Sequence, residues 1–265
     1  MDIHKLVVRK IIDFAFYKSK KNNQNRCKRR IDRVVIYYRI CDKGYPKVKP
    51  NYITKENCLK NALKVFPLNK VDWHIYGDNI SDETYKMLQK YVPDSVIERV
   101  SIGHGAGTFR LVYEEAINNN TDDTLCYFLE DDYLHIEGAL DYLTEAAEEN
   151  YADYITLYDC PDKYGYKNNN PFIKDGGEDT KVFLSSNRHW KLTNSTTMTM
   201  AAYTNVLKRD KTIWWRWTES KHPYDFHIFI DLKLFSKAKL ISPIPSISTH
   251  GETAFLAPLV DWENI

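Results

Sequence analysis

Apolar runs alternate with amphipathic stretches along the first 160 residues of the chain. Short runs rich in β-branched and aromatic residues predict buried strands, and the segments between them carry apolar residues at helical spacing. Thr54 and Ser81 are placed to cap two of these helices. The expected strands are 33–40, 71–76, 95–102, 124–129 and 154–158, and the expected helices are 54–66, 81–91, 108–118 and 137–149.

Strands that alternate with helices predict βαβ units and a mostly parallel sheet, so we expect an α/β fold of the doubly wound kind. After Tyr158 the pattern changes to a polar loop, short antiparallel strands, two helices and an extended tail. The polar loop is expected at 162–178 and the short strands at 181–184, 189–193 and 196–202. The two helices are expected at 204–209 and 226–235, with Asp225 capping the second, and the extended tail at 240–262. The C-terminal half is therefore expected to be mixed.

The pattern predicts one domain over residues 31–265, whose halves are 31–160 and 161–265. Residues 1–30 form a basic arm and linker, with ten lysines and arginines against two aspartates, a net charge of +8. Segment 3–17 has apolar residues at helical spacing. A basic amphipathic helix can lie on an anionic membrane surface as a peripheral contact, or it can pack on the body of the protein. The sequence leaves both open.

Composition narrows the class of protein. The 265 residues are 43% hydrophobic and 14% aromatic, which is typical of a globular chain. The net charge of +1 gives no argument for nucleic acid as a partner. Five scattered cysteines without a CxxC pair indicate neither a zinc knuckle nor a disulfide framework, so we expect reduced thiols in the cytoplasm. No apolar run approaches the ~18 residues of a transmembrane helix.

The strand expected at 124–129 runs directly into Glu130, Asp131 and Asp132, which we call the acidic triplet. In open α/β sheets, ligands bind at the carboxyl ends of the strands. Adjacent carboxylates repel one another unless a cation or a hydrogen-bond donor offsets their charge. The triplet therefore indicates a site for a divalent metal and a phosphate. A solvated acidic turn is the alternative.

The acidic triplet after the fourth strand resembles the EDD form of the DXD motif of GT-A-fold glycosyltransferases. The segments 158–164 and 241–252, which includes His250, also resemble parts of uncharacterised microbial and viral glycosyltransferase-like proteins. The resemblance covers about residues 31–262. It implies a GT-A-like catalytic domain in which 31–160 binds a nucleotide sugar and 161–265 binds the acceptor.

The resemblance also implies roles for individual residues. Asp132 and His250 would ligate Mn²⁺ or Mg²⁺, which stabilises the charge that develops on the diphosphate leaving group. Asp131 would contact the ribose or the metal through water, and Glu130 would contact the donor sugar. Asp78 would contact the nucleoside, although an aspartate beside Asn79 also suits a turn.

Two arginines are further candidates for the donor site. Arg39 follows the first strand and can reach the base or a phosphate, or it can form a salt bridge. Arg110 belongs to a helix that opens at the glycine-rich segment 103–107, and a helix N-terminus favours phosphate. The segment is neither GxGxxG nor a P-loop, so a kinase or NTPase is disfavoured.

Transfer with inversion needs one general base near the acceptor hydroxyl. The resemblance places an acid in the C-terminal half, where Asp225 fits best and Glu219 second. Aromatic rings can stack on sugar faces, and we expect Trp190 and Trp215 on the acceptor side, near the hydroxyl groups of 195–197.

The sequence thus predicts a metal-dependent, inverting hexosyl- or pentosyltransferase. It would use a nucleotide-sugar donor, a UDP-sugar first, and a glycan or glycolipid acceptor. Two rivals stay open. A nucleotidyltransferase shares an α/β sheet with an acidic metal site, although segment 42–46 lacks its glycine- and lysine-rich signature. A non-catalytic sugar-binding module at a membrane surface is the other.

Overall fold

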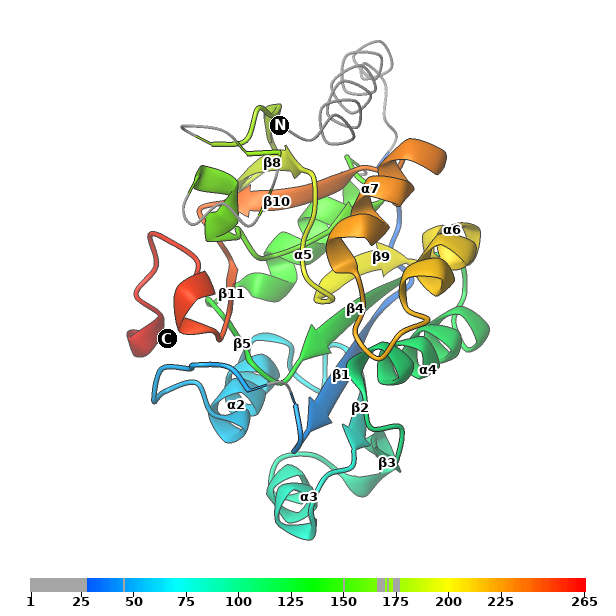
Figure 1. Ribbon diagram of the computed structural model, residues 1–265, viewed down its shortest axis with the longest axis vertical. Coiled ribbons are helices and arrows are strands. Elements are labelled where there is room, and N and C mark those ends of the chain that lie inside the picture. The colour runs from blue at the N-terminus through cyan, green and yellow to red at the C-terminus, as the bar shows by residue number, and fades with distance from the viewer. Residues whose placement is uncertain (1–27, 45, 150, 166–169, 171, 174–176) are drawn as a thin grey trace.

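The computed structural model describes residues 28–44, 46–149, 151–165, 170, 172–173 and 177–265 (Figure 1). The amphipathic segment 3–17 and its predicted membrane contact lie outside these residues. Arg29 is fixed on the domain, because its guanidinium bonds Asp123 at 2.8 Å and lies 3.5 Å from the centre of the Tyr203 ring. The packed body therefore includes the end of the predicted linker. Among the described residues, no helix is long and apolar enough to cross a membrane.

A mixed nine-stranded sheet runs through the molecule in the order β3–β2–β1–β4–β9–β6–β10–β8–β7. Its strands are β1 (Arg33–Cys41), β2 (Asp72–Asp78), β3 (Ile97–Val100), β4 (Thr124–Glu130), β6 (Tyr154–Ile155), β7 (Val182–Leu184), β8 (His189–Thr193), β9 (Met200–Tyr203) and β10 (Leu240–Ile244). The first four strands are parallel, whereas β9 and β8 run antiparallel to their neighbours. The predicted α/β class, with its parallel first half and mixed second half, is confirmed.

Helices flank the sheet (Figure 1). They are α2 (Lys55–Val65), α3 (Asp82–Gln89), α4 (Gly105–Asn118), α5 (Ala139–Glu148), α6 (Thr204–Trp217) and α7 (Asp225–Phe235). Short 3-10 turns cover Asp94–Val96, Pro161–Tyr164, Thr253–Phe255 and Trp262–Asn264. The predicted caps are confirmed, since Thr54 and Ser81 accept hydrogen bonds from Asn57 N–H and Thr84 N–H.

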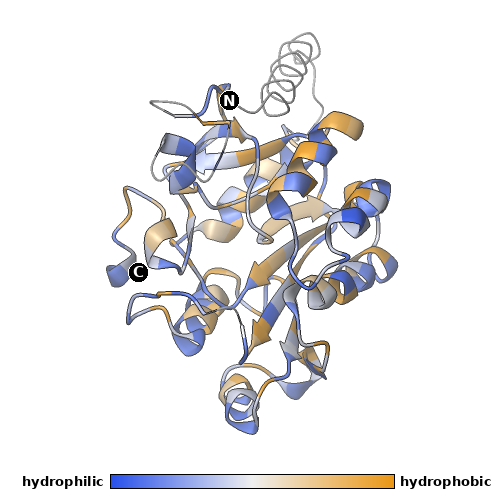
Figure 2. Cartoon of the chain, in the orientation of Figure 1, coloured by the Kyte–Doolittle hydropathy of each residue, from blue (hydrophilic) through white to orange (hydrophobic). Residues whose placement is uncertain are grey.

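Alternate residues of β4 pack on opposite faces of the sheet, as strand geometry requires. Tyr127 packs against Phe66 at the end of α2, whereas Phe128 packs against Phe109 and Tyr113 of α4. Glu130 follows Phe128 by two residues and therefore points to the α4 side. Figure 2 shows apolar residues concentrated in β1 and β4, while the helices carry both apolar and polar residues.

Helix α6 is longer than the sequence predicted. It was expected to end at residue 209, but it continues through the tryptophan-rich segment to Trp217. Trp214 is fully buried against Phe109, and its indole N–H donates to the Tyr154 hydroxyl at 3.0 Å. Burial of this large ring outweighs the modest helix propensity of tryptophan.

A two-stranded ribbon was not anticipated from the sequence. Strands β5 (Tyr133–His135) and β11 (Ser248–His250) pair antiparallel, with His250 opposite Tyr133. The expected strand 154–158 is correspondingly shorter. Its ladder covers only β6, after which Tyr158 forms a single parallel bridge with Ser248 and the Leu157 carbonyl accepts from the amides of Ile247 and Ser248. The ribbon places His250 next to the acidic triplet.

Candidate functional site

The acidic triplet lies where β4 ends, beside the end of β1. Arg39 is the register partner of Glu130, and its Nη2 lies 3.3 Å from Glu130 Oε1. The Arg39 side chain is buried, and it also donates to the Met198 carbonyl at 3.3 Å. Its Nε is buried and has no hydrogen-bond partner among the described groups. Arg39 therefore forms the salt bridge that the sequence allowed, and its buried Nε–H stays unpaired among the described groups.

Asp131 points back toward β1. Its Oδ2 accepts a hydrogen bond from the Cys41 amide at 3.2 Å. Burial, with the negative charge of Asp132 next to it, raises the pKa of the Asp131 carboxyl to about 6. A second carboxylate charge at this position is thus costly unless a cation or a donor approaches it.

Asp132 is the most enclosed member of the triplet. Its Oδ2 lies 2.8 Å from Lys47 Nζ, 3.1 Å from Lys49 Nζ and 3.5 Å from His250 Nε2. Burial alone would raise the pKa of Asp132, but the contacts with His250 and the two ammonium groups outweigh burial and hold that pKa well below its usual range. The Asp132 carboxylate is therefore ionised.

Lys47 and Lys49, which we call the lysine pair, were not singled out in the sequence. Segment 46–50 reads Pro-Lys-Val-Lys-Pro, and in an extended segment alternate side chains point the same way. Val48 between them is 77% exposed, while its carbonyl accepts from the Thr253 amide at 2.8 Å. The spacing of the two lysines indicates that they share one side of the loop. Nothing in the sequence, however, predicts that this loop lies over the acidic triplet.

The predicted metal ligands Asp132 and His250 do come together, but an ammonium group lies with them. Lys47 Nζ donates to Asp132 Oδ2 at 2.8 Å and to His250 Nε2 at 2.9 Å. Asp132 Oδ1 is buried without a partner, as a ligand atom can be. However, the described residues contain no group of three His, Cys, Asp or Glu side chains that could hold a metal ion. With the lysine pair in place, this donor set does not fit a divalent cation.

Asp225 is the first residue of α7 and not its cap, because the position before the helix belongs to Tyr224. Its Oδ1 accepts from the Phe226 amide at 2.7 Å, and the residue is half-buried. Burial raises the pKa of Asp225 to about 6, and the negative charge of Glu130 adds to that effect. Asp225 thus lies within electrostatic reach of the triplet and has the pKa of a group that can take up a proton near neutral pH.

Lys163 is a further residue that the sequence did not indicate. Its buried ammonium group donates to Asn194 Oδ1 at 2.8 Å and to Ser195 Oγ at 2.7 Å, and it lies 3.6 Å from Asp162 Oδ1. Its charge also lowers the pKa of Asp225 against the effect of burial. Lys163 therefore hydrogen-bonds the polar segment 194–195 and also acts electrostatically on Asp225.

Asp78 ends β2 and is saturated with hydrogen bonds from its own chain. Its carboxylate accepts from the amides of Ile102 and Gly103 at 2.8 and 2.9 Å, and from the Thr108 hydroxyl at 2.5 Å. Gly103 has a φ of +82°, a conformation that favours glycine. Asp78 thus anchors the glycine-rich loop, and α4 begins three residues earlier than predicted, with His104 as its cap.

Arg110 and Trp215 lie together on the outer helices. Arg110 Nε donates to the Thr218 hydroxyl at 2.9 Å and its Nη2 to the Trp215 carbonyl at 2.5 Å, while its guanidinium lies 5.3 Å from the Trp215 ring centre. These contacts tie α4 to the end of α6. They do not bring either side chain to the acidic triplet.

Trp190 is fully buried, and its indole N–H donates to the Ser185 hydroxyl at 3.0 Å. A ring with no exposed surface cannot stack on a sugar in this arrangement. The neighbouring hydroxyl groups are also engaged, because Thr196 donates to Thr156 at 3.0 Å and Thr197 pairs with the Tyr133 hydroxyl at 2.5 Å. Trp190 is therefore a core residue, and the predicted contact of its ring with the acceptor is not possible in this arrangement.

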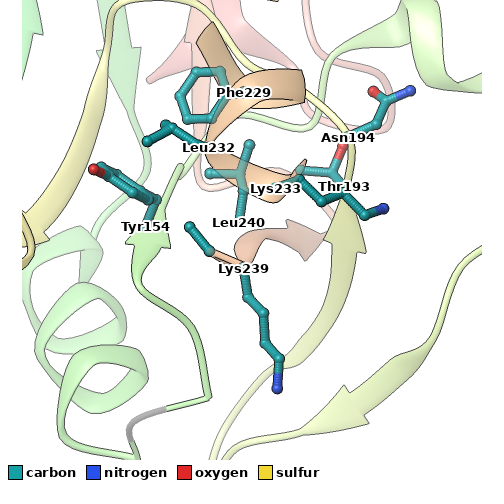
Figure 3. A pocket seen from close by; sticks show the side chains of 9 residues that line it. Tyr154, Thr193, Asn194, Phe229, Leu232, Lys233, Lys239 and Leu240 are labelled. Carbon is teal, nitrogen blue, oxygen red and sulfur yellow. The ribbon is translucent and has the colours of Figure 1, made fainter. Parts of the chain in front are cut away.

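A small pocket lies between α7 and strands β6, β8 and β10 (Figure 3). Its lining residues are Tyr154, Thr193, Asn194, Phe229, Leu232, Lys233, Ala238, Lys239 and Leu240. None of them belongs to the predicted site. The pocket is therefore distinct from the residues gathered around Asp132.

Comparisons with known proteins bear on the fold. No protein-family model matches the chain, and no curated protein is similar to it in sequence. The structure is similar to that of GalNAc-T7 with UDP, GalNAc and Mn²⁺, with a TM-score of 0.55 and 9% identity over 82% of this chain and 43% of that one. S. aureus TarS 1–349 gives a TM-score of 0.48 and 15% identity over 84% of this chain and 59% of that one. The chain spans less than two thirds of the length of either protein. The likeness to GalNAc-T7 shows a GT-A-like fold.

Proposed function

We propose that this protein is a glycosyltransferase that uses a nucleotide-sugar donor, and a UDP-sugar is the first candidate. A fold hosts many functions, so the proposal rests on the site. One observation carries it: the acidic triplet stands at the carboxyl end of the parallel strand β4, beside the end of β1. GalNAc-T7, which shares the fold, was solved with UDP, GalNAc and Mn²⁺.

In this proposal the triplet and its neighbours bind the donor. Glu130 contacts the donor sugar, Asp131 the ribose, and Arg39 the base or a phosphate, while Asp78 holds the loop 102–103 through its hydrogen bonds. The leaving diphosphate needs a cation at Asp132. The proposal requires a positive charge there, and it does not require that the charge be that of a metal.

Asp225 is the proposed general base. Its carboxylate takes the proton of an acceptor hydroxyl while the acceptor oxygen forms a bond to the anomeric carbon. The bond from that carbon to the diphosphate oxygen breaks, and its electron pair leaves with the nucleoside diphosphate. One base and one displacement invert the anomeric centre. The acceptor is a glycan or lipid-linked hydroxyl.

The test is turnover of a panel of nucleotide sugars with and without added Mn²⁺, measured as the release of nucleoside diphosphate. We expect release by the wild-type protein and loss of release in Asp132→Asn. Release of pyrophosphate from a nucleoside triphosphate would instead identify a nucleotidyltransferase. Binding of sugars without turnover of any donor would identify a non-catalytic module.

A further inference from the structure

The lysine pair converges on one carboxylate. Lys47 and Lys49 lie 2.8 and 3.1 Å from the same oxygen of Asp132, so two positive charges face one negative charge. Glu130 is paired with Arg39 at 3.3 Å, and the negative charges of Glu130 and Asp131 also act on Lys47. Arg39 and the lysine pair thus offset the three carboxylates of the triplet, and the two ammonium groups are the cationic groups that an anion would meet next to Asp132.

Both ammonium groups keep hydrogen-bond donors for a ligand. An ammonium group has three N–H bonds. Lys47 uses two of them, on Asp132 and His250, while Lys49 lies 3.1 Å from Asp132 Oδ2 as an ion pair. The two lysine side chains are 23% and 31% exposed, so an anion from solvent can reach the remaining donors.

The same geometry disfavours a divalent cation. An ion held by Asp132 and His250 would take the place of Lys47 Nζ, which contacts both at 2.8 and 2.9 Å. Lys49 would remain beside that ion, and like charges a few ångströms apart repel strongly in a partly buried site. A metal could enter only if both lysine side chains swung away from Asp132 or the loop 46–50 moved, and Thr253 holds that loop through the Val48 carbonyl.

We propose that the lysine pair replaces the divalent metal, and that the ammonium groups of Lys47 and Lys49 bind the diphosphate of the nucleotide sugar directly. This inference rests on the proposed function. Asp132 and His250 act as positioning residues that hold Lys47 toward the donor. During transfer the two ammonium groups stabilise the negative charge that arrives on the diphosphate, and they keep their protons, since the proton of the acceptor goes to Asp225.

Calorimetric titration with UDP tests the inference on metal-free protein in EDTA and on protein in excess MnCl₂. We expect wild-type protein to bind UDP with the same affinity in both solutions. In Lys47→Met/Lys49→Met, affinity in EDTA should fall roughly tenfold or more, because charge-assisted hydrogen bonds are lost. Lys43→Met is the matched control. Lys43 lies on the same loop and is exposed, and we expect its variant to bind as wild type.

Electron paramagnetic resonance of Mn²⁺ gives a readout that does not depend on activity. Wild-type protein should leave the free-ion spectrum unchanged, whereas the double variant should bind Mn²⁺ through Asp132 and His250. If the double variant does not fold, Lys47→Met carries the same test, since Lys47 Nζ occupies the position between Asp132 and His250.

Wild-type binding of UDP that requires Mn²⁺ would overturn the inference and leave the proposed function intact. Undiminished binding by the double variant in EDTA would also overturn it. If no nucleoside diphosphate binds under either condition, the proposed function itself fails. The three results are distinguishable from one titration series.

Discussion

His250 Nε2 lies 3.5 Å from Asp132 Oδ2 because strand β11 pairs with β5, directly after the acidic triplet. Gly251, which directly follows β11, leaves little room beside Asp132. A Cβ built on Gly251 would stand 2.6 Å from the Asp132 carbonyl oxygen and would collide with Ile53. The close approach of Gly251 thus fixes both Asp132 and His250, and with them the lysine pair.

Gly251→Ala should therefore weaken both the fold and the site. We expect a loss of about 1–3 kcal/mol in the free energy of unfolding, because overpacking forces the backbone of Asp132 to shift, and weaker binding of UDP. Urea denaturation and calorimetry measure the two effects. Gly105→Ala is the matched control, since a Cβ there meets nothing within 4 Å. Equal effects of the two substitutions would contradict this role of Gly251.

Asp225→Asn should abolish transfer while UDP still binds. An amide cannot take up the acceptor proton, and the loss of a general base lowers kcat by about 10²–10⁴-fold. Glu219→Gln is the matched comparison, because Glu219 was the second candidate and is exposed. We expect Glu219→Gln to keep wild-type turnover. The opposite pattern would assign the base to Glu219.

The activity should rise with pH through the pKa of Asp225, which burial raises to about 6. The base acts only when ionised, and a carboxyl with that pKa is about one tenth ionised at pH 5 and about nine tenths at pH 7. We therefore expect kcat to increase about tenfold between these values. A pH profile of kcat at saturating donor and acceptor checks this. A flat profile would show that another group limits the reaction.

Asp78→Ala should destabilise the protein by roughly 2–4 kcal/mol, because it leaves the amides of Ile102 and Gly103 and the Thr108 hydroxyl without their acceptor. Thr108→Val removes only one of these donors and should cost about 1 kcal/mol. Urea denaturation ranks the two variants. If Asp78→Ala keeps full stability and loses only affinity for UDP, then Asp78 contacts the nucleoside and is not the anchor of its loop.

Much of the fold could be predicted because the apolar strands and capped helices of the first half carry local signals. Thr54 and Ser81 cap as expected, and β4 ends at the acidic triplet. The predicted end of α6 was wrong because burial of Trp214 in the core stabilises the extra helical turns. The prediction for Trp190 was wrong because its burial depends on partners distant in sequence.

The site was predictable only in part. The acidic triplet was found from its residue types and position, and His250 from the resemblance to glycosyltransferases, but their meeting depends on the β5–β11 ribbon, which has no strong pattern. The lysine pair was missed because two lysines in a proline-flanked loop read as solvated charge. Only the fold brings them to Asp132, and they change what the site can bind.

The most direct measurement of the central claim is release of nucleoside diphosphate from a panel of nucleotide sugars by the wild-type protein, beside Asp132→Asn and Asp225→Asn. We predict that at least one donor, with a UDP-sugar as the first candidate, is turned over, and that Asp225→Asn still binds UDP but releases none from that donor. A wild-type protein that binds no nucleoside diphosphate and turns over no nucleotide sugar, with or without Mn²⁺, would contradict it.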